Sequence, residues 1–152
     1  MSKKPKELLS YKINSILTTN FTCTEKEESE VDELFEREVV TVNMETMIHF
    51  NAAHSIISLD VSTSLQDDSR DEVLVSHNGR TSFDVRELAD FAARTAGHYN
   101  LPGAFLKQLY ELAYAHARAL LAVELAPTVY KNKYHLPVVD AEILVPRSNP
   151  DL

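Results

Sequence analysis

Six histidines are the residues whose chemistry first suggests a metal site or a general base. Imidazole binds zinc and titrates near neutral pH, and two imidazoles one helical turn apart with an acid between them would indicate a zinc peptidase. No pair in this sequence has that spacing. We therefore expect structural or surface roles for all six and no metal site. The histidines are His49, His54, His77, His98, His116 and His135.

Cys23 is the only cysteine, so the chain cannot form an internal disulfide. No Cys-x-x-Cys pair or local Cys/His signature accompanies it, and neither a zinc site nor a thiol nucleophile is indicated. The free thiol, together with a start at Met1 that lacks a signal-peptide pattern, favours a reducing cytoplasm. We expect no catalytic residue and no cofactor, and hence a protein that is not an enzyme.

Residues 25–38 form a strongly acidic stretch with eight acids and two bases. Its carboxylates could bind calcium or dock a partner, but the glycine and the terminal glutamate of a calcium loop are missing. The stretch therefore predicts a solvated connection, with at most one helical turn. The carboxylates that could bind calcium or dock a partner are those of Glu27, Glu28, Glu30, Asp32 and Glu33.

Composition sets the remaining limits on function. The 152 residues fit one domain, for which we expect flexible ends at 1–7 and 147–152. The net charge of −8, from 23 acids and 15 bases, argues against nucleic acid as a partner, because phosphate binding needs a basic face. Only 3 glycines are present, which excludes a glycine-rich phosphate loop. No apolar run has the length of a membrane helix.

The elements that must position any site begin with strands. Residues 11–21 and 40–50 alternate between apolar and polar types, and residues 57–65 do so most cleanly. A fourth run covers residues 72–85. Asn78-Gly79 in its middle predicts either a tight hairpin or a bulge within one long strand.

After Asp84 the apolar period becomes helical. Val85 begins one stripe, for which Asp84 is a plausible cap, and Asn100-Leu101-Pro102 ends it. A second helix is predicted from 103 to 125. One face of it holds, with His116 as its one polar break, Phe105, Leu109, Leu112, Ala113, Leu120 and Val123. Its other sides are apolar as well, so the helix must be covered on more than one side. Strands first and helices last predict an α+β chain with an antiparallel sheet.

These segments resemble SecB-type export chaperones over about residues 8–145. Residues 56–65, a polar turn and residues 72–85 resemble the third and fourth strands of that family, which end in Phe-x-Ile or Phe-x-Val. The segment from Leu112 to Leu121 is similar to the aromatic-Ala-Arg helix of the family. Leu136-Pro137-Val138-Val139-Asp140 then leads into a short helix at 141–144, as in SecB-like proteins.

The resemblance implies a four-stranded antiparallel sheet followed by long helices, assembled into a dimer or tetramer through those helices. It implies ATP-independent binding of non-native polypeptide in apolar grooves, without a cofactor and away from membranes. The client would be an exported protein delivered to SecA, or a dedicated client such as an antitoxin. Asp67 matches an acid that contacts SecA in the family.

The sequence departs from the family at three places. An extra segment, Glu87 to Asn100, precedes the long helix, and Ala126-Pro127-Thr128 replaces a glycine-containing helix exit. The tail extension with which export chaperones engage SecA is missing near Leu152. This last departure favours the dedicated client over export.

The resemblance and the apolar pattern together define two sets of candidate residues. We expect a client-binding groove to contain Leu34, Phe35, Val40, Val42, Met44, Leu106, Tyr110, Tyr114, Val129 and Tyr130. We expect an interface between subunits to contain Phe105, Leu109, Leu112 and Leu120. Two alternatives remain: a ligand-binding α+β protein with a closed pocket, and an oligomerisation module with no affinity for unfolded chains.

Overall fold

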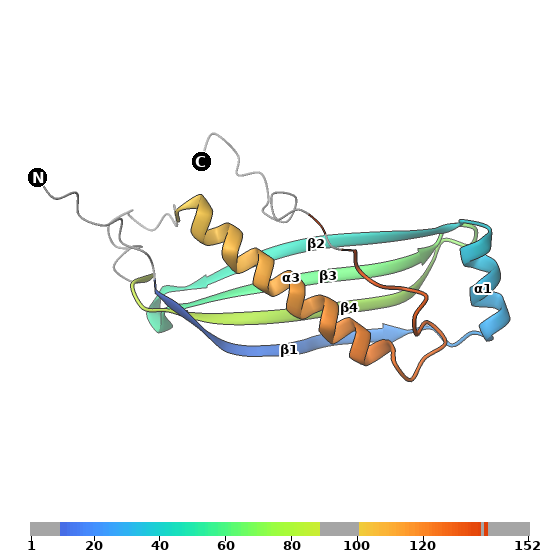
Figure 1. The fold of residues 1–152 in the computed structure, drawn as a ribbon, viewed down its shortest axis with the longest axis horizontal. Helices are drawn as coiled ribbons and strands as arrows, with labels where there is room; N and C mark the ends of the chain where they lie inside the picture. The colour runs from blue at the N-terminus through green and yellow to red at the C-terminus, as the bar shows by residue number, and fades with distance from the viewer. Residues whose placement is uncertain (1–9, 89–100, 138, 140–152) are drawn as a thin grey trace, which may run out of the picture.

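The computed structural model describes residues 10–88, 101–137 and 139, which form a four-stranded antiparallel sheet crossed on one face by a long helix (Figure 1). The order of the strands in the sheet is β1-β4-β3-β2. The predicted α+β class is therefore confirmed. The elements are β1 (Tyr11–Cys23), α1 (Glu28–Glu36), β2 (Val40–Asn51), the 3-10 turn η1 (Ala52–His54), β3 (Ile56–Asp67), β4 (Glu72–Val85) and α3 (Gly103–Leu125).

Strands β2 and β3 follow the alternation in the sequence. Ile57, Leu59, Val61 and Leu65 of β3 are buried on the face that carries α3, whereas the serines between them lie on the opposite face. The antiparallel register sets Val42 opposite Leu65 and therefore places it on the α3 face. In these two strands the alternation of apolar and polar residues therefore predicts which side chains face α3.

Asn78-Gly79 lies within β4, which runs unbroken from Glu72 to Val85, so the hairpin alternative is wrong. The register of β4 with β1 shifts after Ile13 and again after Thr18 of β1, and Leu74 is an extra residue of β4 opposite the step from Leu65 to Gln66 of β3. Each extra residue moves the following side chains to the other face. The strict alternation expected for residues 11–21 is therefore broken, and Ile16 rather than Leu17 shares the face of Ile13.

Gly79 allows α3 to approach the sheet closely. A Cβ added at this position would lie 3.3 Å from both Cα and Cβ of Ala117. The absence of a side chain on β4 and a methyl group on α3 thus let two backbones pack closely at the point where the helix crosses. Glycine is needed here because there is no room for a side chain between β4 and α3, and not because the backbone adopts a conformation that only glycine allows.

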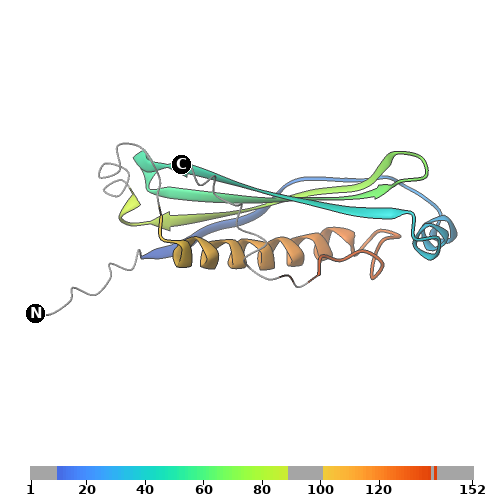
Figure 2. The ribbon, with the colours of Figure 1, turned by 90° about the horizontal axis from the view of Figure 1, so that it is seen from above.

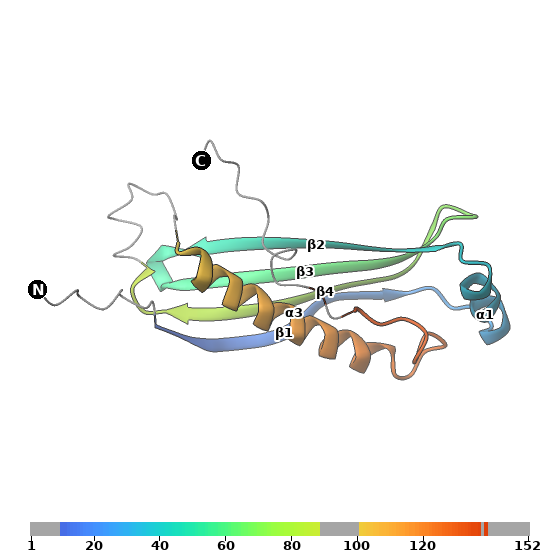
Figure 3. The same cartoon turned by 45° about the horizontal axis from the view of Figure 1, so that its top comes forward.

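Helix α3 begins and ends where the sequence predicts, but the row of side chains that faces the sheet is rotated from the expected one. Figures 2 and 3 show α3 on one face of the sheet, crossing it obliquely from the side of β2 and β3 toward β1. Val123, expected on the buried row, is 71% exposed, and Leu112 and Leu120 are only half-buried. The buried residues of α3 are Phe105, Leu109, Tyr110, Ala113, Tyr114, Ala117, Leu121 and Leu125.

The connection between β1 and β2 is more ordered than predicted. It contains α1, a helix of 9 residues, where at most one turn was expected. Val31 and Leu34 are buried and belong to the main core. Two apolar residues three positions apart in the acidic stretch share one helix face, and their packing fixes α1 at the end of the sheet.

Part of the helical stripe predicted after Asp84 is strand. Val85 is the last residue of β4, and Asp84 accepts hydrogen bonds from the Asn14 side chain of β1 instead of capping a helix. The rest of that stripe, the short helix expected at 141–144 and the two ends of the chain lie outside the described residues. No helix in the part of the chain that the structure describes is long and apolar enough to cross a membrane.

We predict that Gly79→Val lowers the free energy of unfolding by about 1–3 kcal/mol, because the new side chain must push α3 away from β4. The midpoint of urea denaturation measures this. Gly103→Ala is the matched control, since no atom lies within 4 Å of an added Cβ there. Equal midpoints for Gly79→Val and the wild type would contradict the close approach.

Candidate functional site

The helix-facing side of β2 is an apolar surface that α3 leaves partly uncovered. We call it the β2 strip. It lies on the same face as the fully buried row of β3, yet Val42 is 46% exposed and its neighbours in the strip are half-buried. The oblique course of α3 explains this, because the helix packs on β4, β3 and β1 (Figure 1). The strip consists of Val40, Val42, Met44, Thr46, Ile48 and Phe50.

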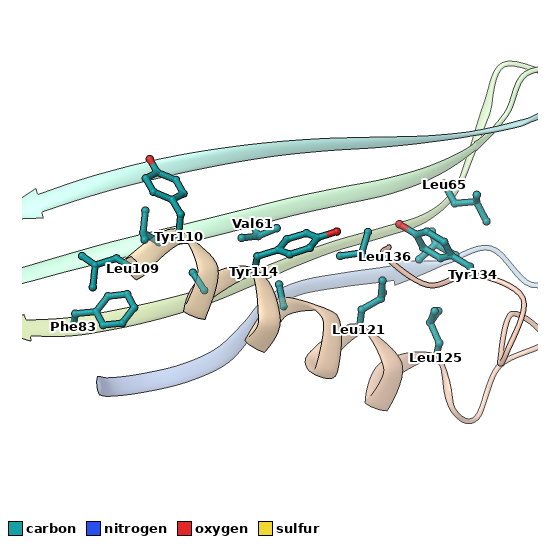
Figure 4. Packing of buried hydrophobic residues seen from close by; sticks show 14 of the residues in the cluster. Val61, Leu65, Phe83, Leu109, Tyr110, Tyr114, Leu121, Leu125, Tyr134 and Leu136 are labelled. Atoms are coloured by element: carbon teal, nitrogen blue, oxygen red, sulfur yellow. The ribbon is translucent and has the colours of Figure 1, made fainter. Parts of the chain in front are cut away.

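Tyr110 extends from α3 toward β2, and Tyr114 points along the sheet toward Leu136 (Figure 4). Both were expected to wall a groove, but both are buried and belong to the core. Burial raises the pKa of the Tyr110 phenol to about 12, so the ring is neutral. The Tyr114 hydroxyl donates to the carbonyl oxygen of Pro137 at 2.5 Å. These rings form the floor beside the strip, with half-buried Leu106 next to them on α3.

The remaining groove candidates lie at the other end of the sheet. Leu34 is buried and Phe35 is half-buried against the core. Tyr130 is fully buried, and its hydroxyl donates to the carbonyl oxygen of Thr24 at 3.0 Å. Val129 is half-buried beside it. The structure thus joins Val40, Val42 and Met44 in one accessible strip and places Leu34 near its Val40 end. It sets Val129 and Tyr130 beside the end of β1, at the opposite edge of the sheet. The role of all these residues in binding stays a prediction.

Two of the residues expected at an interface between subunits are buried inside their own chain instead. Phe105 and Leu109 face the sheet of their own chain, and Phe105 makes an edge contact with Tyr11 at 5.7 Å between ring centroids. Leu112 and Leu120 are half-buried in the helix row of His116, which lies over Thr81 of β4. Ile13 and Ile16 of β1, which sequence reasoning missed, are 42% and 41% exposed. The first bulge in β1, between Ile13 and Ser15, places them together on the α3 face.

Asp67 ends β3 with its carboxylate turned inward, and it is only 1% exposed. Its Oδ1 accepts hydrogen bonds from the backbone N–H and the hydroxyl of Ser69, at 2.9 and 2.5 Å. The Ser69 hydroxyl is the main reason that the pKa of the carboxyl group is lowered. Contact with a motor protein through Asp67 stays a prediction, and it would require this turn to open.

A cavity of about 620 Å³ lies between the β1–α1 connection and the chain after α3. It opens to solvent past Glu25, Glu27 and Pro127, all exposed, and is therefore not a closed pocket inside the sheet. Cys23 lines it, but burial raises the pKa of the thiol, which opposes a nucleophilic role. The other lining residues are Thr24, Lys26, Glu30, Thr128 and Val129.

Two histidines lie between α3 and the sheet. His77 of β4 is buried, and its Nε2 is 3.0 Å from the hydroxyl of Thr18. His116 of α3 has its Nδ1 3.0 Å from the hydroxyl of Thr81. Burial lowers the pKa of both rings, so both are neutral at neutral pH. Within the described ranges no group of three or more His, Cys, Asp or Glu side chains could hold a metal ion.

The other described histidines lie away from this interface. His49 and His135 are exposed, and His54 ends the η1 turn, where its backbone N–H donates to the side chain of Asn51. His98 lies outside the described residues.

The face of the sheet opposite α3 is covered with paired polar side chains. Arg80 donates to both carboxylate oxygens of Asp60, at 2.7 and 3.0 Å, and these bonds lower the pKa of Asp60. Ser58 pairs with Ser82 at 2.9 Å in the next cross-strand row. Polar pairs of this kind suit a face in contact with water. Three exposed apolar side chains, those of Leu17, Met47 and Val73, also lie on this face, but they are single residues on three different strands, and Arg80 and Asp60 separate Leu17 from Met47. The continuous apolar row of β2 lies on the α3 face.

No family model and no curated protein matches the sequence. Among solved structures, the chain is similar to a SecB-like chaperone of Mycobacterium tuberculosis, solved in complex with a ChAD peptide from the HigA1 antitoxin. The similarity covers 86% of this chain and 90% of that one, with 13% sequence identity and a TM-score of 0.46. The fold class and the candidate site described above rest on the structure of this chain itself.

We predict that the free energy of unfolding falls as the pH drops below about 6.5, because the unfolded chain then binds protons that buried His77 and His116 resist. Each group contributes a slope of at most about 1.4 kcal/mol per pH unit. Asp60 and Asp67, whose folded pKa values are lowered, add a second loss only below about pH 4.

Urea denaturation at pH 7.5, 6.5 and 5.5 measures the histidine slope. His77→Gln should flatten it, whereas exposed His135→Gln should leave it unchanged. A slope that is the same in His77→Gln and in the wild type would contradict the assignment of this pH dependence to His77.

Proposed function

We propose that this chain is an ATP-independent holding chaperone that binds non-native polypeptide along the β2 strip. The observation that carries the proposal is an apolar strip in line with the core that the helix of its own chain leaves half-exposed. An apolar surface of this kind on the covered side of a sheet is typical of a site for another polypeptide. The proposal agrees with the SecB-like resemblance of the sequence.

The position of the strip supports binding of extended chains. β2 is an edge strand of the described sheet, and its strip alternates with side chains on the opposite face that are polar except for Met47. An extended segment beside β2 would place every second side chain on the strip, and edge backbone groups can add affinity. Such binding tolerates many sequences, because it depends on apolar area, worth about 25 cal/mol per Å², rather than on particular side chains.

The partly exposed strip favours weak binding of many unfolded clients over tight binding of one specific partner. Contacts with half-exposed aliphatic side chains are individually weak, so affinity grows with the number of apolar residues that the client exposes. A folded protein hides those residues and would leave the strip. The proposed cycle therefore needs no nucleotide, since folding or transfer of the client ends the contact.

We also propose that the chain works as a homo-oligomer, a dimer or a tetramer. The support is a second apolar area at the other edge of the sheet, formed by Ile13 and Ile16 of β1 and by Leu112, Leu120 and Val123 of α3. Together with the β2 strip it leaves apolar surface on both sides of α3. A second copy of the chain covering the β1 side would keep the β2 side for clients.

The proposed activity is tested by refolding a chemically denatured protein with and without equimolar chaperone in the absence of ATP. We expect the wild type to slow refolding and to bind reduced, iodoacetamide-blocked pancreatic trypsin inhibitor, which stays unfolded. A protein that leaves refolding unchanged and does not bind the blocked inhibitor would rule out the chaperone function.

We predict that Val42→Asp weakens binding of the blocked inhibitor at least about tenfold, because an apolar client would desolvate an unpaired carboxylate. Stability should change by less than about 1 kcal/mol, since Val42 is already half-exposed. Asn43→Asp is the matched control: it adds the same charge on the same strand but on the opposite face. Equal loss in both variants would place the binding site elsewhere.

Light scattering after size-exclusion chromatography tests the oligomer. We expect a dimer or tetramer for the wild type and dissociation for Ile16→Asp, because the new carboxylate would be buried without a partner. Leu17→Asp, exposed on the opposite face of the same strand, should leave the assembly intact. A monomeric wild type would refute this part of the proposal.

Proteins that co-purify with the chain separate the possible clients. An exported precursor would favour service to SecA, and an antitoxin would favour a dedicated role. A protein that forms the oligomer but binds no unfolded chain would favour the oligomerisation module instead.

A further inference from the structure

The twelve residues after α3 form a separate structural unit, which we call the strap, residues 126–137. These twelve residues, all within the described part of the chain, form turns but neither helix nor strand. Its backbone hydrogen bonds are local: Thr128 N–H donates to Leu125, Lys131 to Thr128, and both Lys133 and Tyr134 to Tyr130. The strap is therefore not joined to the sheet by a backbone ladder within the described part of the chain.

The strap covers part of the apolar face of the sheet with its own side chains. Tyr130, Tyr134 and Leu136 are all buried in the main core. In Figure 4, Leu136 and Tyr134 continue the line of Tyr114 along the sheet, toward Leu65. Leu65 lies directly opposite Val42 of the β2 strip. The strap thus occupies apolar surface that is continuous with the proposed client site.

Side-chain contacts hold the strap at its middle and at its far end. Near its middle, Lys133 Nζ lies 2.9 Å from Asp32 and 3.3 Å from Glu28, both on α1. These two carboxylates raise the pKa of Lys133, so the amine is charged. At its far end, Arg118 Nε donates to the carbonyl oxygen of Leu136 at 2.9 Å, and Tyr114 donates to that of Pro137. Opening the middle of the strap would break the Lys133 ion pairs and the Tyr130–Thr24 hydrogen bond.

Two buried hydroxyl groups between the strap and the sheet have incomplete hydrogen bonding. The hydroxyl oxygens of Thr63 and Tyr134 are buried near each other, and neither makes a hydrogen bond of normal geometry with a described residue. Burial raises the pKa of the Tyr134 phenol, and the neighbouring Thr63 hydroxyl only partly offsets that rise. Both hydroxyls regain water when the strap lifts, which offsets part of the apolar contact that is lost. The regained hydration therefore lowers the cost of local opening at the strap.

We propose that the strap is a displaceable lid latched by Lys133 to α1, and that a client takes the apolar surface which Tyr130 and Tyr134 leave. This inference rests on the proposed chaperone function and adds a regulation to the same site. In the closed state the strap acts as an internal competitor with two tyrosines and a leucine. The client binds the open fraction, so its apparent affinity rises in proportion to that fraction.

The ion pairs at Lys133 supply a decisive pair of variants. Lys133→Ala removes both ion pairs of the latch and Asp32→Asn removes the shorter one, and the two variants change the net charge in opposite directions. Lys131→Ala is the matched control, because Lys131 is an exposed lysine of the same strap with the same charge change. Two measurements are made on the full chain: hydrogen exchange of the amides of residues 130–136 without client, and the Kd for the blocked trypsin inhibitor described above.

We expect faster exchange in the strap and a twofold to fivefold lower Kd in both Lys133→Ala and Asp32→Asn, with no change in Lys131→Ala. The double variant should gain no more than Lys133→Ala, since loss of the Lys133 amine already removes both ion pairs. At high salt the wild type should approach the variants, because screening weakens the latch.

Three outcomes would overturn the inference, and they differ from one another. Opposite shifts of Kd in Lys133→Ala and Asp32→Asn would show a plain effect of net charge. Faster strap exchange with an unchanged Kd in both variants would show that the strap does not compete with clients, while leaving the chaperone function intact. Failure of every variant and of the wild type to bind the inhibitor would refute the proposed function and the lid with it.

Discussion

One helix must cover a four-stranded sheet, and this constraint decides what the molecule can bind. α3 has 23 residues and is about 35 Å long, and strands of 12 to 14 residues reach about 40–45 Å. A helix about 10 Å wide laid obliquely across such a sheet covers a diagonal band. Two corners of the same face stay partly open, one on β2 and one on β1. The exposed aliphatic residues Val42, Ile13 and Ile16 lie in these corners.

Each other feature adapts to that arrangement. Gly79 and Ala117 bring helix and sheet together at the crossing, and His77 and His116 fill the interface as neutral rings. The strap fills the space beyond the end of α3 with Tyr130 and Tyr134, and α1 ties it down through Lys133. The apolar surfaces proposed for binding, assembly and regulation all lie on the α3 face.

Sequence reasoning succeeded where local pattern alone decides structure. The alternation of β3 predicted its buried row, and the apolar run between Pro102 and Ala126 predicted both ends of α3. Val40, Val42 and Met44 were correctly placed on one face of β2. It failed where a partner strand or a crossing angle decides. Asn78-Gly79 has the composition of a turn but serves close packing, and the bulges of β1 carry no residue signature that would reveal them.

The sequence by itself determined the class of the fold, the order of its elements and the inward-facing residues of β2 and β3, because alternation and helical period are local properties. Only the tertiary structure decided which apolar residues form the core and which stay accessible. Tyr110 and Tyr130 are buried while Val42 and Ile16 are half-exposed, although all four are apolar residues in regular patterns or apolar context. Their fates depend on the angle at which α3 crosses the sheet and on the return of the strap, and contacts between residues far apart in the chain set both.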